Sequence, residues 1–117
     1  MSHAEAIRLS VRFYSQINGT EPVREWLLEL SRDERRAIGD DIKTVQFGWP
    51  LGMPVVRKLG PRLWEIRSDL RDGIARVLFT TVDQTMVLLH GVIKKQQKLA
   101  RSDLELARRR MKEVHHG

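Results

Sequence analysis

The hydrophobic pattern of the chain changes its period near Pro54, and this change restricts the fold more than any other feature. Between Val23 and Val45, apolar residues recur every three or four positions, as they do along one face of a helix. After Pro54, apolar and polar residues alternate, as they do along a strand. The connections between these alternating segments are short enough for hairpins. We therefore expect a four-stranded antiparallel meander, with strands at Val55 to Leu59, Leu63 to Ser68, Ile74 to Thr81 and Met86 to Ile93.

The first half of the chain is expected to hold one strand and a pair of helices. Strict alternation predicts a half-buried strand from Ile7 to Tyr14. Thr20 is the expected cap of a first helix, whose apolar stripe consists of Val23, Trp26, Leu27 and Leu30. Ser31 and Glu34 have capping-box spacing, so a second helix should begin almost where the first one ends. The segment Gly48 to Pro50 should stop it, which makes the two helices a hairpin or a kinked pair.

A last helix is expected from Ser102, where Ser102 and Glu105 again have capping-box spacing. Its inward stripe would be Leu104, Ala107 and Met111. The last three residues, His115, His116 and Gly117, are expected to be a frayed end. The order of elements is then strand, two helices, four-stranded meander and helix, which predicts a single α+β domain over residues 1–117.

Composition restricts the class of partner. The chain has 21 Lys and Arg against 15 Asp and Glu, a formal net charge of +6 and a pI near 10.3. Such a balance favours an anionic partner: nucleic acid, an acidic protein or a membrane surface.

The chain has no cysteine and no apolar run long enough to span a bilayer, so we expect a cytoplasmic protein that has no membrane partner. No histidine lies four residues from another, and we expect neither a metal site nor a cofactor.

Arginines alternate with core residues on two neighbouring predicted strands. Trp64 and Ile66 share one face of their strand, which leaves Arg67 on the other. Arg76 is placed in the same way on the next strand, and Lys58 lies one strand earlier. These cations are expected to converge on an exposed basic sheet face suited to a phosphate backbone. The alternative is that they are only the solvated side of a half-covered sheet.

Several segments together resemble a known family of bacterial toxins. They are Leu63 to Arg67, Gly73 to Phe79 and Leu88 to Lys95, followed by Glu105, Ala107 and Arg110. Together with the order of elements, they resemble the HigB-type, phage-derived branch of the RelE/ParE toxin superfamily, over nearly the whole chain. The resemblance implies a RelE-like fold and the toxin half of a type II toxin–antitoxin pair. Such a toxin is typically an endoribonuclease that enters the ribosomal A site and cuts translating mRNA. Its partner would be a HigA-like helix-turn-helix antitoxin.

The chain departs from this branch at two places. Phe79 stands where the branch commonly has a tyrosine, and Leu99-Ala100 stands where it has a proline. Tyr14 is therefore the only tyrosine in the chain, and a tyrosine-assisted step near the meander cannot be carried over.

Cleavage of RNA without a metal needs a base for the 2′-OH, cations for the phosphorane and an acid for the leaving oxygen. Arg67 and Arg76 are expected to hold the scissile phosphate. The acid and the base stay open. His90 is one candidate because imidazole is a common acid–base group, although a histidine at the end of a strand is more often structural. Glu65 is predicted on the face of Arg67 but is equally suited to be a salt-bridge partner, and a lysine of lowered pKa is a third route. Further contacts to RNA are expected from Arg57, Lys58, Arg62, Lys94, Lys95 and Lys98.

Other functions fit the same residues. A ParE-like inhibitor of DNA gyrase would act by binding and would need no catalytic residues, and a non-catalytic module would hold nucleic acid without cutting it. Among the indoles, Trp26 and Trp64 are expected in the core. Trp49 is either a stacking platform for a base or a plug at the end of the second helix.

Overall fold

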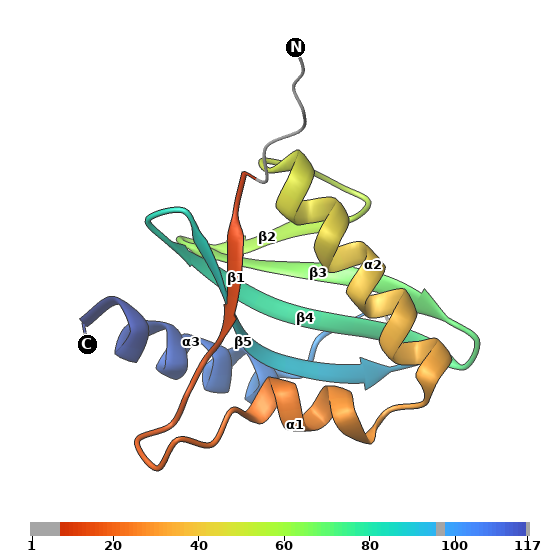
Figure 1. Ribbon diagram of the computed structural model, residues 1–117, viewed down its shortest axis with the longest axis horizontal. Coiled ribbons are helices and arrows are strands. Elements are labelled where there is room, and N and C mark those ends of the chain that lie inside the picture. The colour runs from red at the N-terminus through yellow and green to blue at the C-terminus, as the bar shows by residue number, and fades with distance from the viewer. Residues whose placement is uncertain (1–7, 96–97, 117) are drawn as a thin grey trace.

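A five-stranded mixed sheet with helices on both faces makes up the protein (Figure 1). The structure, a computed structural model, describes residues 8–95 and 98–116. Its elements are β1 (Ser10–Phe13), α1 (Pro22–Glu29), α2 (Arg32–Gly48), β2 (Val56–Gly60), β3 (Leu63–Leu70), β4 (Gly73–Val82), β5 (Thr85–Lys94) and α3 (Arg101–His116). The strands lie in the order β1-β5-β4-β3-β2, with β1 parallel to β5 and all other neighbours antiparallel. The α+β class expected from the sequence is confirmed.

The helices α1 and α2 cover one face of the sheet, and α3 covers the other (Figure 1). Under α1 and α2, alternate strand residues such as Ile66, Val77 and Leu88 pack against Ile38 and Val45 of α2. This apolar layer removes side chains from water on both elements, which is the main force that holds the helices on the sheet.

Trp49 belongs to the layer under α2. Its ring makes edge contacts with Trp64 at 5.1 Å and with Phe79 at 5.6 Å between centroids, a geometry that aromatic pairs favour. The structure therefore supports the helix-end plug over the base-stacking platform.

The ends of the helices test the predicted caps. At α2, the Ser31 hydroxyl accepts the Glu34 N–H and the Glu34 carboxylate accepts the Ser31 N–H, so this capping box is confirmed. At α1, Glu21 and not Thr20 occupies the cap position, without a side-chain hydrogen bond. At α3 the helix begins at Arg101, so Ser102 lies inside the first turn and is not the cap.

A β-bulge interrupts the alternation of β5. Leu78 of β4 is opposite His90, and the next residue, Phe79, is opposite Leu88. Leu89 is therefore an extra residue of β5 that has no partner on β4. Leu89 packs in the layer under α3, with Leu78. After Leu89, the residues of β5 that would otherwise face α3 face α1 and α2, and the reverse. Gly91 therefore faces the indole of Trp26 on α1, and the ring atoms leave no space for a Cβ at this position.

The layer under α3 contains polar side chains as well as apolar ones. The Tyr14 hydroxyl donates to Glu113 at 2.5 Å, and the guanidinium of Arg110 lies 5.1 Å from the centroid of the Tyr14 ring. Burial first, and then the hydrogen bond to Glu113, raises the pKa of Tyr14 above 10.0. His115 shares a hydrogen bond of 2.9 Å with the buried Thr80 hydroxyl, so the expectation of a frayed helix end at this residue is wrong.

The N-terminal strand is shorter than predicted. It covers only Ser10–Phe13, and Ile7 lies outside the described residues. Val11 remains 39% exposed at the sheet edge, whereas Tyr14 is buried. Within the part of the chain that the structure describes, no helix has the length and apolarity needed to cross a membrane.

Candidate functional site

Arg67 and Arg76 are direct neighbours across β3 and β4, on the face that α3 covers. The carboxylate of Glu65 lies between them, 3.4 Å from Nη1 of Arg76 and 4.0 Å from Nε of Arg67. The period-two pattern thus placed all three side chains on the same face correctly. Because two guanidinium groups flank one carboxylate, this triad carries a net positive charge.

The expected exposure of this face is wrong. Arg76 is only 1% exposed and Glu65 is fully buried, while the side chain of Arg67 keeps 20% of its surface in contact with solvent. The alternation of β4 shows which way Arg76 points, but not that α3 packs against β4 and β5 on that side. Buried charges need opposite charges beside them, so Glu65 serves Arg76 as a salt-bridge partner.

The register of β2 corrects a second expectation. Lys58 is opposite Trp64, which places it on the face of α1 and α2, away from Arg67. Arg57 is opposite Glu65 and exposed, so Arg57 and not Lys58 extends the charged face onto β2.

His90 lies on β5, next to the strand of Arg76 and two strands from Arg67, and α3 packs against it. Its Nε2 is 2.8 Å from Oδ1 of Asp103, and Nζ of Lys94 is 3.4 Å from Oδ2 of the same carboxylate. Burial is the largest single influence on Asp103 and opposes its ionisation, but the hydrogen bond and charge of His90, with those of Lys94, lower the pKa of Asp103 below 3.8. His90 is 17% exposed, so the ring is oriented by Asp103 yet reaches solvent.

The remaining expected RNA contacts divide into two groups. Lys95 and Lys98 are exposed and follow β5, at the end of the sheet where Lys94 lies. Arg62 is in the turn before β3, five residues from Arg67 or about 17 Å along an extended strand. It lies near His115, whose pKa is lowered by burial first and then by the charge of Arg62. Arg62 is therefore not part of the cluster around Arg67.

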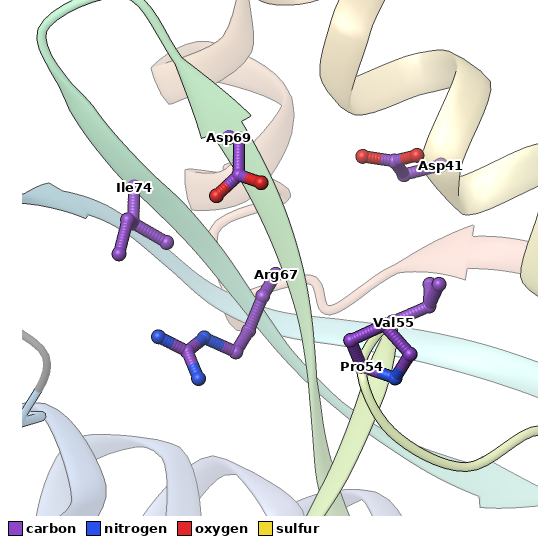
Figure 2. Close-up of a pocket in the computed structure, with 6 residues that line it drawn as sticks. All are labelled: Asp41, Pro54, Val55, Arg67, Asp69 and Ile74. Carbon is purple, nitrogen blue, oxygen red and sulfur yellow. The ribbon is translucent and has the colours of Figure 1, made fainter.

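A cavity of about 500 Å³ adjoins Arg67 at the edge of β3 (Figure 2). Its lining residues are Asp41, Pro54, Val55, Arg67, Asp69 and Ile74. Figure 2 shows the two carboxylates, from α2 and β3, at one end, while the Arg67 side chain extends away from them towards α3. The cavity thus has an acidic end and a basic end. The described residues contain no group of three His, Asp or Glu side chains placed to hold a metal ion.

Comparison with known families agrees with this architecture. Residues 25–112, most of the chain, match the model of the family described as Phage derived protein Gp49-like (DUF891). The chain belongs to this Gp49-like family. It is a family of the RelE/ParE toxin type, and its members are commonly toxins of toxin–antitoxin systems, which implies an antitoxin as partner. No curated protein matches the chain.

Sequence reasoning on this Gp49-like chain missed three carboxylates of the site. Asp103 was part of an expected capping box, and its contact with His90 joins residues 13 positions apart through the connection after β5. Asp41 is on the α2 surface and Asp69 at the end of β3, and only the meeting of these two elements brings them to one cavity. The acidic residues at helical spacing in α2 did not indicate this cavity, because such residues usually face solvent.

Proposed function

We propose that the protein is the toxin of a type II toxin–antitoxin pair and that it inhibits translation as a ribosome-dependent, metal-independent mRNA endoribonuclease. The observation that carries the proposal is the position of Arg67, whose partly exposed side chain lines a cavity in a chain of a toxin family. It lies on the same sheet face as His90 and Lys94. Arginine is suited to a phosphate because it stays charged and can bind two oxygens at once.

The geometry suggests a division of roles among the charged residues. Arg67 would bind the scissile phosphate directly. Arg76 is buried and would act as a positioning residue, since its ion pair with Glu65 fixes the carboxylate that also faces Arg67. Arg57, Lys94, Lys95 and Lys98 would contact the RNA backbone.

His90 is the residue best placed to exchange protons with the substrate. Because Nε2 is engaged by Asp103, Nδ1 would take the proton of the 2′-OH or supply one to the departing 5′ oxygen. β3 and β5 are two strand spacings apart, about 10 Å, a gap that the long Arg67 side chain and the substrate phosphate would have to bridge. The ribosome would hold the mRNA in place across it. The cytoplasm, where mRNA is translated, is the proposed location, and a HigA-like helix-turn-helix protein is the proposed antitoxin.

One observation favours a second function, inhibition of DNA gyrase by binding. Glu65 and Arg76, two of the four expected catalytic residues, are buried in an ion pair, and an inhibitor that only binds needs neither of them at its surface. Binding of nucleic acid without cleavage is compatible with the same burial.

Induced expression in a bacterial host separates these functions. We would compare the unaltered protein with Arg67→Ala and with Arg36→Ala, a matched loss of one exposed arginine on α2, across the sheet from the site. Growth arrest and new 5′ ends within translated mRNA are expected for the unaltered and Arg36→Ala proteins. Arg67→Ala should lower the cleavage rate on the order of 10²-fold, as expected for loss of a group that stabilises a transition-state charge. Arrest with intact mRNA would favour gyrase, and no arrest at all would reject the toxin assignment.

A further inference from the structure

The bulge in β5 has a backbone carbonyl that is bound by a side chain of α3. Leu89 is the extra residue of the strand and is left out of the pairing with β4. It is fully buried, and a buried carbonyl without a hydrogen bond destabilises a fold. Arg110 supplies that bond, because its Nη1 donates to the Leu89 carbonyl at 2.7 Å, a length typical of a charge-assisted hydrogen bond.

The guanidinium of Arg110 is itself fixed by its neighbours. It lies 5.1 Å from the centroid of the Tyr14 ring, and the Tyr14 hydroxyl donates to Glu113, one turn further along α3. Burial is the largest influence on Arg110 and lowers its pKa below the ordinary value, although the group stays charged. A charge that is partly removed from water needs partners, and the Leu89 carbonyl and the Tyr14 ring are such partners.

The bound carbonyl controls the backbone at His90. The Leu89 carbonyl and the His90 N–H belong to one planar peptide group, so a bond that fixes this carbonyl also fixes how the chain enters His90. The helix α3 thus contacts this short segment twice, through Arg110 at the carbonyl and through Asp103 at Nε2 of the imidazole, 2.8 Å away. Asp103 and Arg110 are seven positions apart, so they share one face of α3 and are separated by about 10 Å along its axis.

A cavity of about 200 Å³ beside β5 suggests a different role for Arg110, as a direct ligand of RNA. His90 and Arg110 line this cavity. The other lining residues have apolar side chains or none: Pro22, Val23, Trp26, Gly91 and Leu106. Such walls are poorly suited to a phosphate, and Nη1 of Arg110 is already engaged by the Leu89 carbonyl. The contacts therefore favour support of the backbone over contact with the substrate.

We propose that Arg110 is a positioning residue for His90: by holding the carbonyl of the bulge residue Leu89, its guanidinium sets the orientation in which the imidazole meets Asp103. The part of His90 in proton transfer rests on the proposed function, whereas the orientation of its ring does not. The helix α3 then has two tasks, since it covers the sheet and aligns the histidine.

The first measurement uses the full chain labelled with ¹⁵N, without ribosome or RNA. Long-range ¹H–¹⁵N spectra, recorded where the imidazole is neutral and assigned with His90→Gln, show which ring nitrogen carries the proton. We expect the proton of His90 on Nε2, towards Asp103. Arg110→Met should give a mixture of both tautomers. Arg110→Lys keeps a cationic donor and should keep the single tautomer, as should Arg109→Met, which removes the exposed arginine one position earlier.

The second measurement is cleavage of mRNA on the ribosome. Arg110→Met should lower kcat about tenfold, a part of the roughly 10²–10⁴-fold that a positioned acid or base contributes, and should leave KM within about twofold. Arg109→Met should change neither. A raised KM with unchanged kcat, or a single Nε2–H tautomer of His90 in folded Arg110→Met, would overturn the proposal.

The unaltered protein decides the question if Arg110→Met does not fold. Slow exchange of the Nη1 protons of Arg110 with water supports the bond to Leu89, and free exchange would overturn it. The expected tautomers without any cleavage of mRNA by the unaltered protein would reject the proposed function, while Arg110 would stand as the residue that orients His90.

Discussion

The buried pair of Glu65 and Arg76 gives a prediction about stability that separates structure from catalysis. Glu65→Gln keeps the shape of the side chain and removes its charge. Two ions 3.4 Å apart attract by about 5 kcal/mol at an effective dielectric constant of about 20. Removal of one partner of a buried pair is known to cost about 3–5 kcal/mol, a similar magnitude. The substitution also removes the negative charge that offsets the repulsion between Arg67 and Arg76, which are direct cross-strand neighbours.

Urea and thermal unfolding would measure this effect. For a domain of this size about 4 °C of Tm accompanies each kcal/mol, so the melting temperature of Glu65→Gln should fall by roughly 12–20 °C. The control is Glu105→Gln, which breaks an exposed pair with Arg101 on α3 and should cost less than about 1 kcal/mol. The double variant Glu65→Leu with Arg76→Met should recover most of the stability, because neither charge is then left buried. A loss below about 1 kcal/mol for Glu65→Gln would refute the reasoning.

Two further substitutions test the packing of α1 and the role of α3. Gly91→Ala places a Cβ 2.4 Å from ring carbons of Trp26, so we expect a loss of about 1–3 kcal/mol in urea unfolding, smaller when Trp26→Leu is present as well; equal losses in both backgrounds would contradict the contact. Asp103→Asn removes a carboxylate whose folded pKa lies below the unfolded value of 3.8, so its contribution is complete above that pH and is lost as the pH falls through the folded pKa. The stability difference between the unaltered protein and Asp103→Asn should therefore be largest at neutral pH and should shrink below about pH 4; a difference that is constant from pH 7 to pH 2 would contradict the linkage.

The local signals in the sequence were sufficient for much of the fold. Period two identified four strands of the second half, and the spacing of Ser31 and Glu34 located the start of α2. The bulge at Leu89 had no such signal. Strict alternation would have turned His90 away from Leu89, whereas the extra residue lets both lie on the face of α3.

The sequence predicted only those features of the site that depend on the alternation of side chains within a single strand. Alternation placed Glu65, Arg67 and Arg76 on one face, but the burial of Arg76 depends on where α3 docks, which is a tertiary contact. Lys58 was assigned to the wrong face because the register between β2 and β3 depends on an irregularity between Lys58 and Gly60 that the sequence does not mark.

The parallel pairing of β1 with β5 bears on how the chain is made. Ser10 is opposite Thr85, 75 residues later, and their hydroxyl groups are 3.0 Å apart. At about 5–20 residues per second, a ribosome needs roughly 4–15 s to synthesise the segment between them. β1 can pair with β5 only after that delay. The helix α3, which follows β5 in the chain, is synthesised later still. The sheet face that bears Arg67 and His90 therefore receives its cover only after the whole sheet has been synthesised.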